Sequence, residues 1–131
     1  MEQTHTAFED TPLWSILARA TELLDSDPHE VIIQASAALK AAPGQPQALQ
    51  LLIFAMRALG DDAGARRTLE EMAAQLPQLA SVHLELGLLL AELGDNEGAV
   101  RALTQVIALE PQHPQASRAL ADALALVGDT E

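Results

Sequence analysis

The four histidines are the first residues in this chain whose type could support chemistry, because imidazole is a common metal ligand. They are His5, His29, His83 and His113. Zinc needs three or four ligands that converge on one point. His83 and Glu85 are two residues apart, so on a helix their side chains point about 200° apart and cannot chelate one ion. There is no cysteine to complete a site. The sequence therefore predicts no metal and no other cofactor.

Carboxylates and hydroxyls are the next candidates, as acid–base groups and nucleophiles. Asp61 and Asp62 are adjacent, but Asp61 follows a glycine and suits the N-cap of a helix. Glu70 and Glu71 suit the solvated face of a helix. The serines have no histidine base in a recognisable motif near them, and no glycine-rich loop follows a strand. We therefore expect no enzymatic activity in this chain.

Charge narrows the choice of partner. Nineteen acidic and seven basic residues give a formal net charge of -12. A nucleic acid would be repelled, because its binding needs clustered Lys and Arg, and an anionic membrane surface is disfavoured for the same reason. The segment 46–79, which contains Arg57, Arg66 and Arg67, is nearly neutral, and the segments on either side are acidic. This distribution serves solubility, or it steers a basic partner towards the chain.

The sequence also carries signals about the compartment. Residues 1–6 lack the basic and then apolar pattern of a signal peptide, and no apolar run approaches the roughly 18 residues of a membrane span. With no cysteine, disulfides are excluded. We expect a cytoplasmic protein. Lys40 is the only lysine, and the bias towards Ala, Leu and Arg indicates a bacterial source.

Helix-breaking residues recur at a fixed spacing, and this regularity is the strongest pattern in the chain. Gly-Asp pairs begin at positions 60, 94 and 128, in two equal steps, and prolines at 43, 77 and 111 repeat with the same step. The segment 81–93 is too long for a typical strand, and Gly94 suits its C-terminal end. Asp95 can then cap a helix over about 96–109, which Pro111 ends. Another helix is expected over about 114–127. Aromatic residues are only 2% of the chain, which also favours an all-α protein.

With these positions in place, the sequence resembles the tetratricopeptide repeat (TPR) family. In a repeat starting at Ala80, the family's positions fall at Leu86, Gly87, Leu90, Ala99, Leu103 and Pro111. The resemblance implies a single domain over 1–131, with repeats over about 12–45 (degenerate), 46–79, 80–113 and 114–131 (partial), and a flexible segment 1–10. It implies a right-handed α-solenoid of about three and a half stacked helix pairs.

The family's ligand-facing positions imply a protein-binding groove on the concave face. Transferred to this chain, they are Gln47, Gln50, Phe54, Arg57, Leu84, Leu88, Ala91, Gln115, Arg118 and Asp122. Phe54, Leu84 and Leu88 are expected to be exposed, which favours a partly apolar peptide or helix as the ligand. Members of the family that bind chaperones hold a C-terminal carboxylate with lysines and asparagines. Those residues are mostly missing here, so that function is disfavoured. The alternative for these positions is a solvated surface without a ligand.

The last predicted helix has apolar residues that the next helix would cover in the family. They include Leu120, Leu124 and Val127. Either this chain is a fragment of a longer protein, or a second copy covers the surface as a homodimer. The segment from Glu110 to Asp129 also resembles repeat arrays that precede bacterial sulfotransferase-type domains. This resemblance implies an alternative function, as a regulatory or positioning domain of a larger enzyme.

Overall fold

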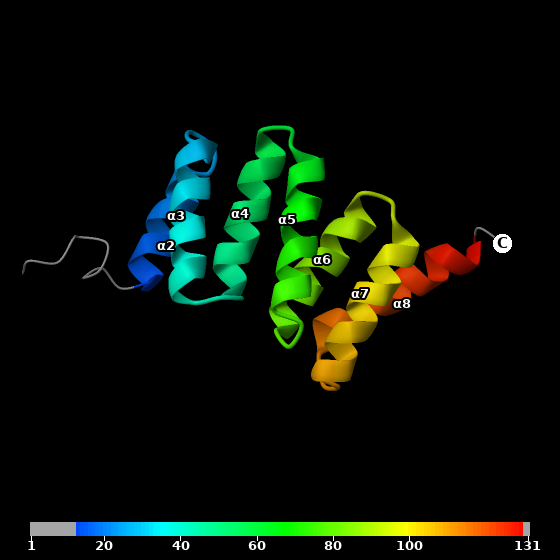
Figure 1. Cartoon of the computed structure of the whole chain (residues 1–131). Helices are drawn as coiled ribbons and strands as arrows, with labels where there is room; N and C mark the ends of the chain where they lie inside the picture. The colour runs from blue at the N-terminus through cyan, green and yellow to red at the C-terminus, as the bar shows by residue number, and fades with distance from the viewer. Residues whose placement is uncertain (1–12, 130–131) are drawn as a thin grey trace, which may run out of the picture. The chain divides into compact units, whose positions relative to one another are not determined.

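A computed structural model describes residues 13–129, which form seven α-helices and, within that range, no strand (Figure 1). The helices divide into two compact units. The N-terminal unit, up to Asp61, contains α2 (Leu13–Leu23), α3 (Pro28–Ala41) and α4 (Pro46–Ala58). The C-terminal unit, from Asp62, contains α5 (Asp62–Gln75), α6 (Ala80–Glu92), α7 (Asn96–Leu109) and α8 (Pro114–Asp129). The predicted flexible segment 1–10 lies outside the described residues.

Local sequence fixes where the helices of the N-terminal unit begin. Asp27 caps α3, where its Oδ1 accepts a hydrogen bond from the Glu30 N–H at 3.2 Å. Pro28 occupies the first turn, where its missing N–H costs nothing. Gln45 caps α4, because its Oε1 accepts from the Ala48 N–H at 2.7 Å. The three helices then pack α2 on α3 and α3 on α4, around fully buried side chains that include Leu17, Val31 and Leu49.

The tight turns inside the helix pairs depend on glycine. Gly60 and Gly94 have φ of +81° and +89°, a left-handed conformation that glycine adopts at little cost. Each of these turns is closed by a hydrogen bond over five residues, from the N–H of Asp61 to Met56 and from that of Asp95 to Leu90. In the first turn Ser26 replaces the glycine, and the Asp27 N–H bonds to Leu23, only four residues back. The hydrogen bond that closes the first turn therefore spans one residue fewer, although four residues (24–27) separate α2 from α3 and three separate the helices of each later pair.

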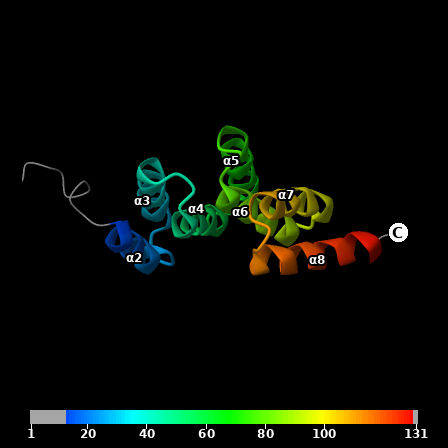
Figure 2. The same cartoon turned by 90° about the horizontal axis from the view of Figure 1, so that it is seen from below.

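In the C-terminal unit, α6 is the central element. It packs on α5 and most extensively on α7, and it also touches α8 (Figure 2). Its side chains are buried on nearly every side, as expected for a helix with an uninterrupted apolar run over 86–90, and Glu85 is buried with them. Gly87 faces Leu103 of α7 so closely that an added Cβ would lie 2.7 Å from the Leu103 Cγ. The small residue at position 87 therefore sets the approach of these two helices.

Helix α8 packs against α7 through small residues and leaves larger ones in solvent. Ala116 and Ala123 are buried. Leu124 and Leu126 are 51% and 49% exposed. Small residues at the contact allow α8 to lie close to α7, but its aliphatic side chains are not covered by the residues that the structure describes.

Candidate binding surfaces

The four site residues predicted in α4 lie on one face of that helix. Gln47, Gln50, Phe54 and Arg57 follow a spacing of three, four and three residues, which is one side of an α-helix. The first three are exposed, and Arg57 is partly buried. Phe54 is 59% exposed, an unusual position for one of only two phenylalanines in the chain. We call these four residues the α4 stripe.

In α6 one expectation of exposure is wrong. Leu84 is only 8% exposed, and Leu88 and Ala91 are partly buried. The reason is that α6 has neighbours on several sides, so few of its side chains reach solvent. The predicted cluster of three exposed apolar residues is thus reduced to Phe54 and part of Leu88.

The predicted site residues of α8 are fully on the surface. Gln115, Arg118 and Asp122 are exposed and share one face of the helix. They belong to the C-terminal unit, with Leu88 and Ala91, whereas the α4 stripe belongs to the N-terminal unit. The single groove that would join all of them stays a prediction.

A second surface in the C-terminal unit was missed by the sequence reasoning. It is a trench of about 300 Å³ with walls from α5 and α7 and a floor from α6. Its lining residues are Arg66, Glu70, Ala73, His83, Leu86, Leu90, Gly98, Arg101, Ala102 and Gln105. We call it the α5–α7 trench. The spacing of 66, 70 and 73 indicates one face of a helix, but sequence alone does not reveal that this face looks across at α7.

The arginine of the α5 wall is held by two carboxylates. Arg66 donates from Nε to Glu70 at 3.0 Å and from Nη2 to Asp95 at 2.9 Å. The Glu70 hydrogen bond contributes most to raising the pKa of Arg66. Asp95 also accepts from the Gly98 N–H at 2.9 Å, and this bond, assisted by Arg66, holds the pKa of the Asp95 carboxyl below its usual range. Arg66 and Asp95 are therefore both ionised and paired with each other at neutral pH.

The histidine in the trench floor has a structural partner. The Nε2 of His83 lies 2.9 Å from the Pro77 carbonyl, to which it donates, and the side chain is buried. Among residues 13–129, no group of three or more His, Asp or Glu side chains is arranged to hold a metal ion. Nor is any helix in that range long and apolar enough to cross a membrane.

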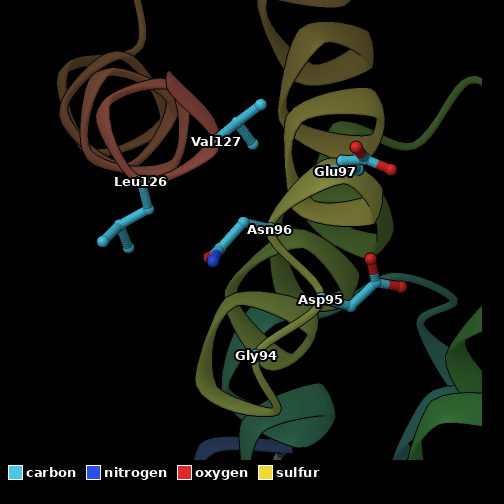
Figure 3. A pocket seen from close by; sticks show the side chains of 6 residues that line it. All are labelled: Gly94, Asp95, Asn96, Glu97, Leu126 and Val127. Atoms are coloured by element: carbon cyan, nitrogen blue, oxygen red, sulfur yellow. The ribbon is translucent and has the colours of Figure 1, made fainter. Parts of the chain in front are cut away.

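A second hollow, of about 240 Å³, lies between the start of α7 and the last turns of α8 (Figure 3). The Asn96 side chain points towards α8, and the Asp95 side chain points away from it. The Asn96 Oδ1 is buried and accepts no hydrogen bond from the described residues. Leu126 and Val127 supply the apolar part of this hollow.

Comparison with known proteins identifies the repeat. A model of the tetratricopeptide repeat family matches residues 81–113, which are α6 from its second residue, the turn that follows it, α7, and the segment between α7 and α8. The chain contains a tetratricopeptide repeat. A comparison with curated protein sequences finds no match.

Solved structures share the fold of the whole described chain. The TPR domain of Sgt2 from Aspergillus fumigatus aligns with a TM-score of 0.69 and 21% identity, over 92% of this chain and 82% of that one. The first TPR domain of Spaghetti (RPAP3), solved with an HSP90 peptide, aligns with a TM-score of 0.67 and 17% identity, over 88% and 95%. An O-GlcNAc transferase from Thermobaculum terrenum aligns with a TM-score of 0.64 and 27% identity, over 92% of this chain but only 23% of that one. These matches confirm the predicted α-solenoid fold class.

The geometry of the tetratricopeptide repeat explains why its sequence positions matter. Gly87 of α6 lies against Leu103 of α7, and Ala99 and Leu103 are fully buried. The resemblance assigns these residues to the family's small and large positions, and the structure gives the reason: the two helices interlock there.

Proposed function

We propose that this chain is a protein-interaction scaffold that holds a partly apolar peptide or helix of a partner protein. The α4 stripe is the observation that carries the proposal. It presents Phe54 to solvent on the same helix face as Gln47, Gln50 and Arg57, which suits an apolar anchor with polar groups beside it. The TPR domain of Spaghetti, whose fold this chain shares, was solved with a peptide of HSP90 bound.

The chemistry of the stripe argues for a ligand different from that peptide. The peptide SRMEEVD has an acidic C-terminal half. The corresponding helix faces here offer Gln50, Phe54 and Asp122, and their cations are Arg57 on α4 and Arg118 on α8. The chain also carries a net charge of -12. A basic or apolar segment would be attracted or tolerated, but a strongly acidic one would be repelled.

The test compares two exposed apolar residues of the same unit. Phe54→Glu places a charge in the α4 stripe, and Ile33→Glu places one on α3, where Ile33 is 62% exposed. Both variants should keep the helix content of the wild type, because neither side chain is buried. Partner proteins captured from a lysate of the source organism, quantified by mass spectrometry, should be lost with Phe54→Glu and kept with Ile33→Glu. Equal capture by all three proteins would refute this role of the stripe.

A second candidate is a regulatory or positioning domain of a larger enzyme. The match to part of the Thermobaculum terrenum transferase supports it, since this chain corresponds to 23% of that protein. No sulfotransferase is among the matches described above, so the enzyme class stays open. The observation that tests this candidate is the natural reading frame: an enzyme domain in the same frame supports it, and a frame that contains none rules it out.

A third candidate is self-association through α8. The exposed Leu124 and Leu126 support it, because a second copy could cover them. Light scattering over a wide range of concentrations tests it. A mass that rises towards the dimer, and that Leu124→Glu returns to the monomer, would support self-association. A monomer throughout would exclude it.

A further inference from the structure

The α5–α7 trench opens on a different side of α6 from the residues of the proposed groove. Leu86 and Leu90 form part of its floor, whereas Leu84 and Leu88 belong to the groove positions. Leu86 lies two residues after Leu84, and Leu90 lies two residues after Leu88. Two residues turn an α-helix by about 200°, so the two pairs of side chains point to different sides of α6. The trench is therefore a separate surface, and an inference about it stands independently of the function proposed above.

The shape of the trench suits an extended segment with one aliphatic side chain. Helices α5 and α7 both pack on α6 but make no extensive contact with each other, which leaves the space between them. Leu86 and Leu90 in the floor and Ala102 in the α7 wall give the trench a narrow apolar strip, since these side chains are 8%, 4% and 7% exposed. Gly98 has no side chain to fill the trench at one end of the α7 wall. A larger residue does not fit at this position, because its Cβ would lie 2.7 Å from the Asp95 carboxylate.

The two walls differ in whether their polar side chains have partners. On the α5 wall, Arg66 and Glu70 pair with each other. On the α7 wall, Arg101 and Gln105 lie one helical turn apart, both are exposed, and neither side chain forms a hydrogen bond or ion pair with any described residue. Arg101 only lowers the pKa of Asp95 through its charge, without an ion pair. The α7 wall thus presents a free guanidinium and a free amide beside an apolar floor.

We propose that the α5–α7 trench docks an extended segment of a partner protein that carries one acidic residue next to an aliphatic one. The carboxylate pairs with Arg101, the Gln105 amide bonds to the backbone of the segment, and the aliphatic side chain lies on Leu86 and Leu90. Charge complementarity selects this occupant: a basic segment would meet the positive charge of Arg101. A run of several acids would be disfavoured by the net charge of the whole chain.

The experiment is an NMR titration of the full 131-residue chain with short capped peptides. The probe is acetyl-Gly-Leu-Asp-Gly-amide, with Asn in place of Asp as the neutral control and Ser in place of Leu as the control without an aliphatic group. We expect amide shifts that concentrate on Gly98, Ala102 and Gln105, with weaker binding of both control peptides. Shifts scattered over the chain, or equal for all three peptides, would overturn the proposal.

Matched variants identify the cation. Arg101→Glu should weaken binding of the Asp peptide at least tenfold, and Arg101→Gln, which removes the charge with less disturbance, should weaken it several-fold. Arg67→Glu is the control, because Arg67 is also exposed, occupies the corresponding position of the preceding repeat, and does not line the trench. An equal loss with Arg67→Glu would mean that general charge and not the trench binds the peptide, and would overturn the proposal.

Two further measurements distinguish the trench from the α4 stripe and from a general carboxylate site. Phe54→Glu should leave peptide binding unchanged, so a failure of the α4 stripe and a failure of the trench are distinguishable. Acetate that binds as tightly as the peptide would show a site for small carboxylates, against the proposal. Trench shifts that appear with rising protein concentration alone, and vanish in Arg101→Glu, would show that a second copy of the chain is the occupant, which also overturns it.

Discussion

Arg66 and Asp95 are 29 residues apart in the chain and are joined by an ion pair of 2.9 Å. Arg66 lies in α5, and Asp95 caps the N-terminus of α7. The carboxylate therefore has two tasks: it accepts from the Gly98 N–H at the start of its own helix, and it ties α5 to the turn between α6 and α7. A single side chain thus links a local capping motif to the packing of successive helices.

Replacing this carboxylate should cost stability through both tasks. For Asp95→Ala we expect a loss of about 1 kcal/mol from the N-cap. The ion pair adds less, because both side chains are partly exposed and water screens their charges. Urea unfolding followed by circular dichroism measures the loss. A matched control is Asp122→Ala, which removes an exposed carboxylate from α8 and should change the free energy of unfolding little. Equal stability of Asp95→Ala and wild type would contradict the capping geometry.

The same carboxylate should make stability depend on pH. The hydrogen bond from Gly98, assisted by Arg66, lowers the pKa of Asp95 in the folded state. A lowered pKa means that the ionised form stabilises the fold above the unfolded-state pKa of about 3.9, and that this contribution is lost as the pH falls through the lower folded-state value. The difference in unfolding free energy between wild type and Asp95→Asn should therefore be largest near neutral pH and shrink below about pH 4. A difference that stays constant from pH 7 to pH 3 would contradict it.

The close approach of α6 and α7 predicts a strong effect at Gly87. A Cβ at this position would lie 2.7 Å from the Cγ of Leu103, so Gly87→Leu must push the helices apart. We expect a loss of roughly 1–3 kcal/mol or more from overpacking, measured by urea unfolding. Gly128→Ala is the control, because a Cβ there meets nothing within 4 Å. That control should be neutral or slightly stabilising, since alanine is the better helix former. Similar stability of the two variants would disprove the interlocked packing.

The turn glycines should be sensitive for a different reason. Gly94 has φ of +89°, and a Cβ there would have open space around it. Gly94→Ala therefore strains only the backbone, at a cost of roughly 1–2 kcal/mol, without any clash. Gly60→Ala, at φ of +81°, should cost about the same. Thermal melts of both variants test this. If alanine at both positions were neutral, the left-handed turn conformation would be wrong.

Much of the fold could be predicted from local signals. The helix expected over about 96–109 is Asn96–Leu109, and that expected over 81–93 is Ala80–Glu92. Glycines, prolines and capping aspartates act within a few residues of their own position, so the sequence alone locates the ends of helices. The equal spacing of these signals predicted a fold of repeated helix pairs, and the matches to solved TPR domains confirm it.

The binding surfaces could be predicted only in part, because exposure depends on what packs against a residue. The sequence placed Phe54 on an exposed face, but Leu84, which was expected to be exposed on the same grounds, is buried among the neighbours of α6. The α5–α7 trench was not foreseen, since its walls come from helices that are separated by the whole of α6. Local chemistry along the chain determined the helices and their turns. Only the packing of one helix on another decided which side chains meet, which are covered, and which of them are left facing solvent.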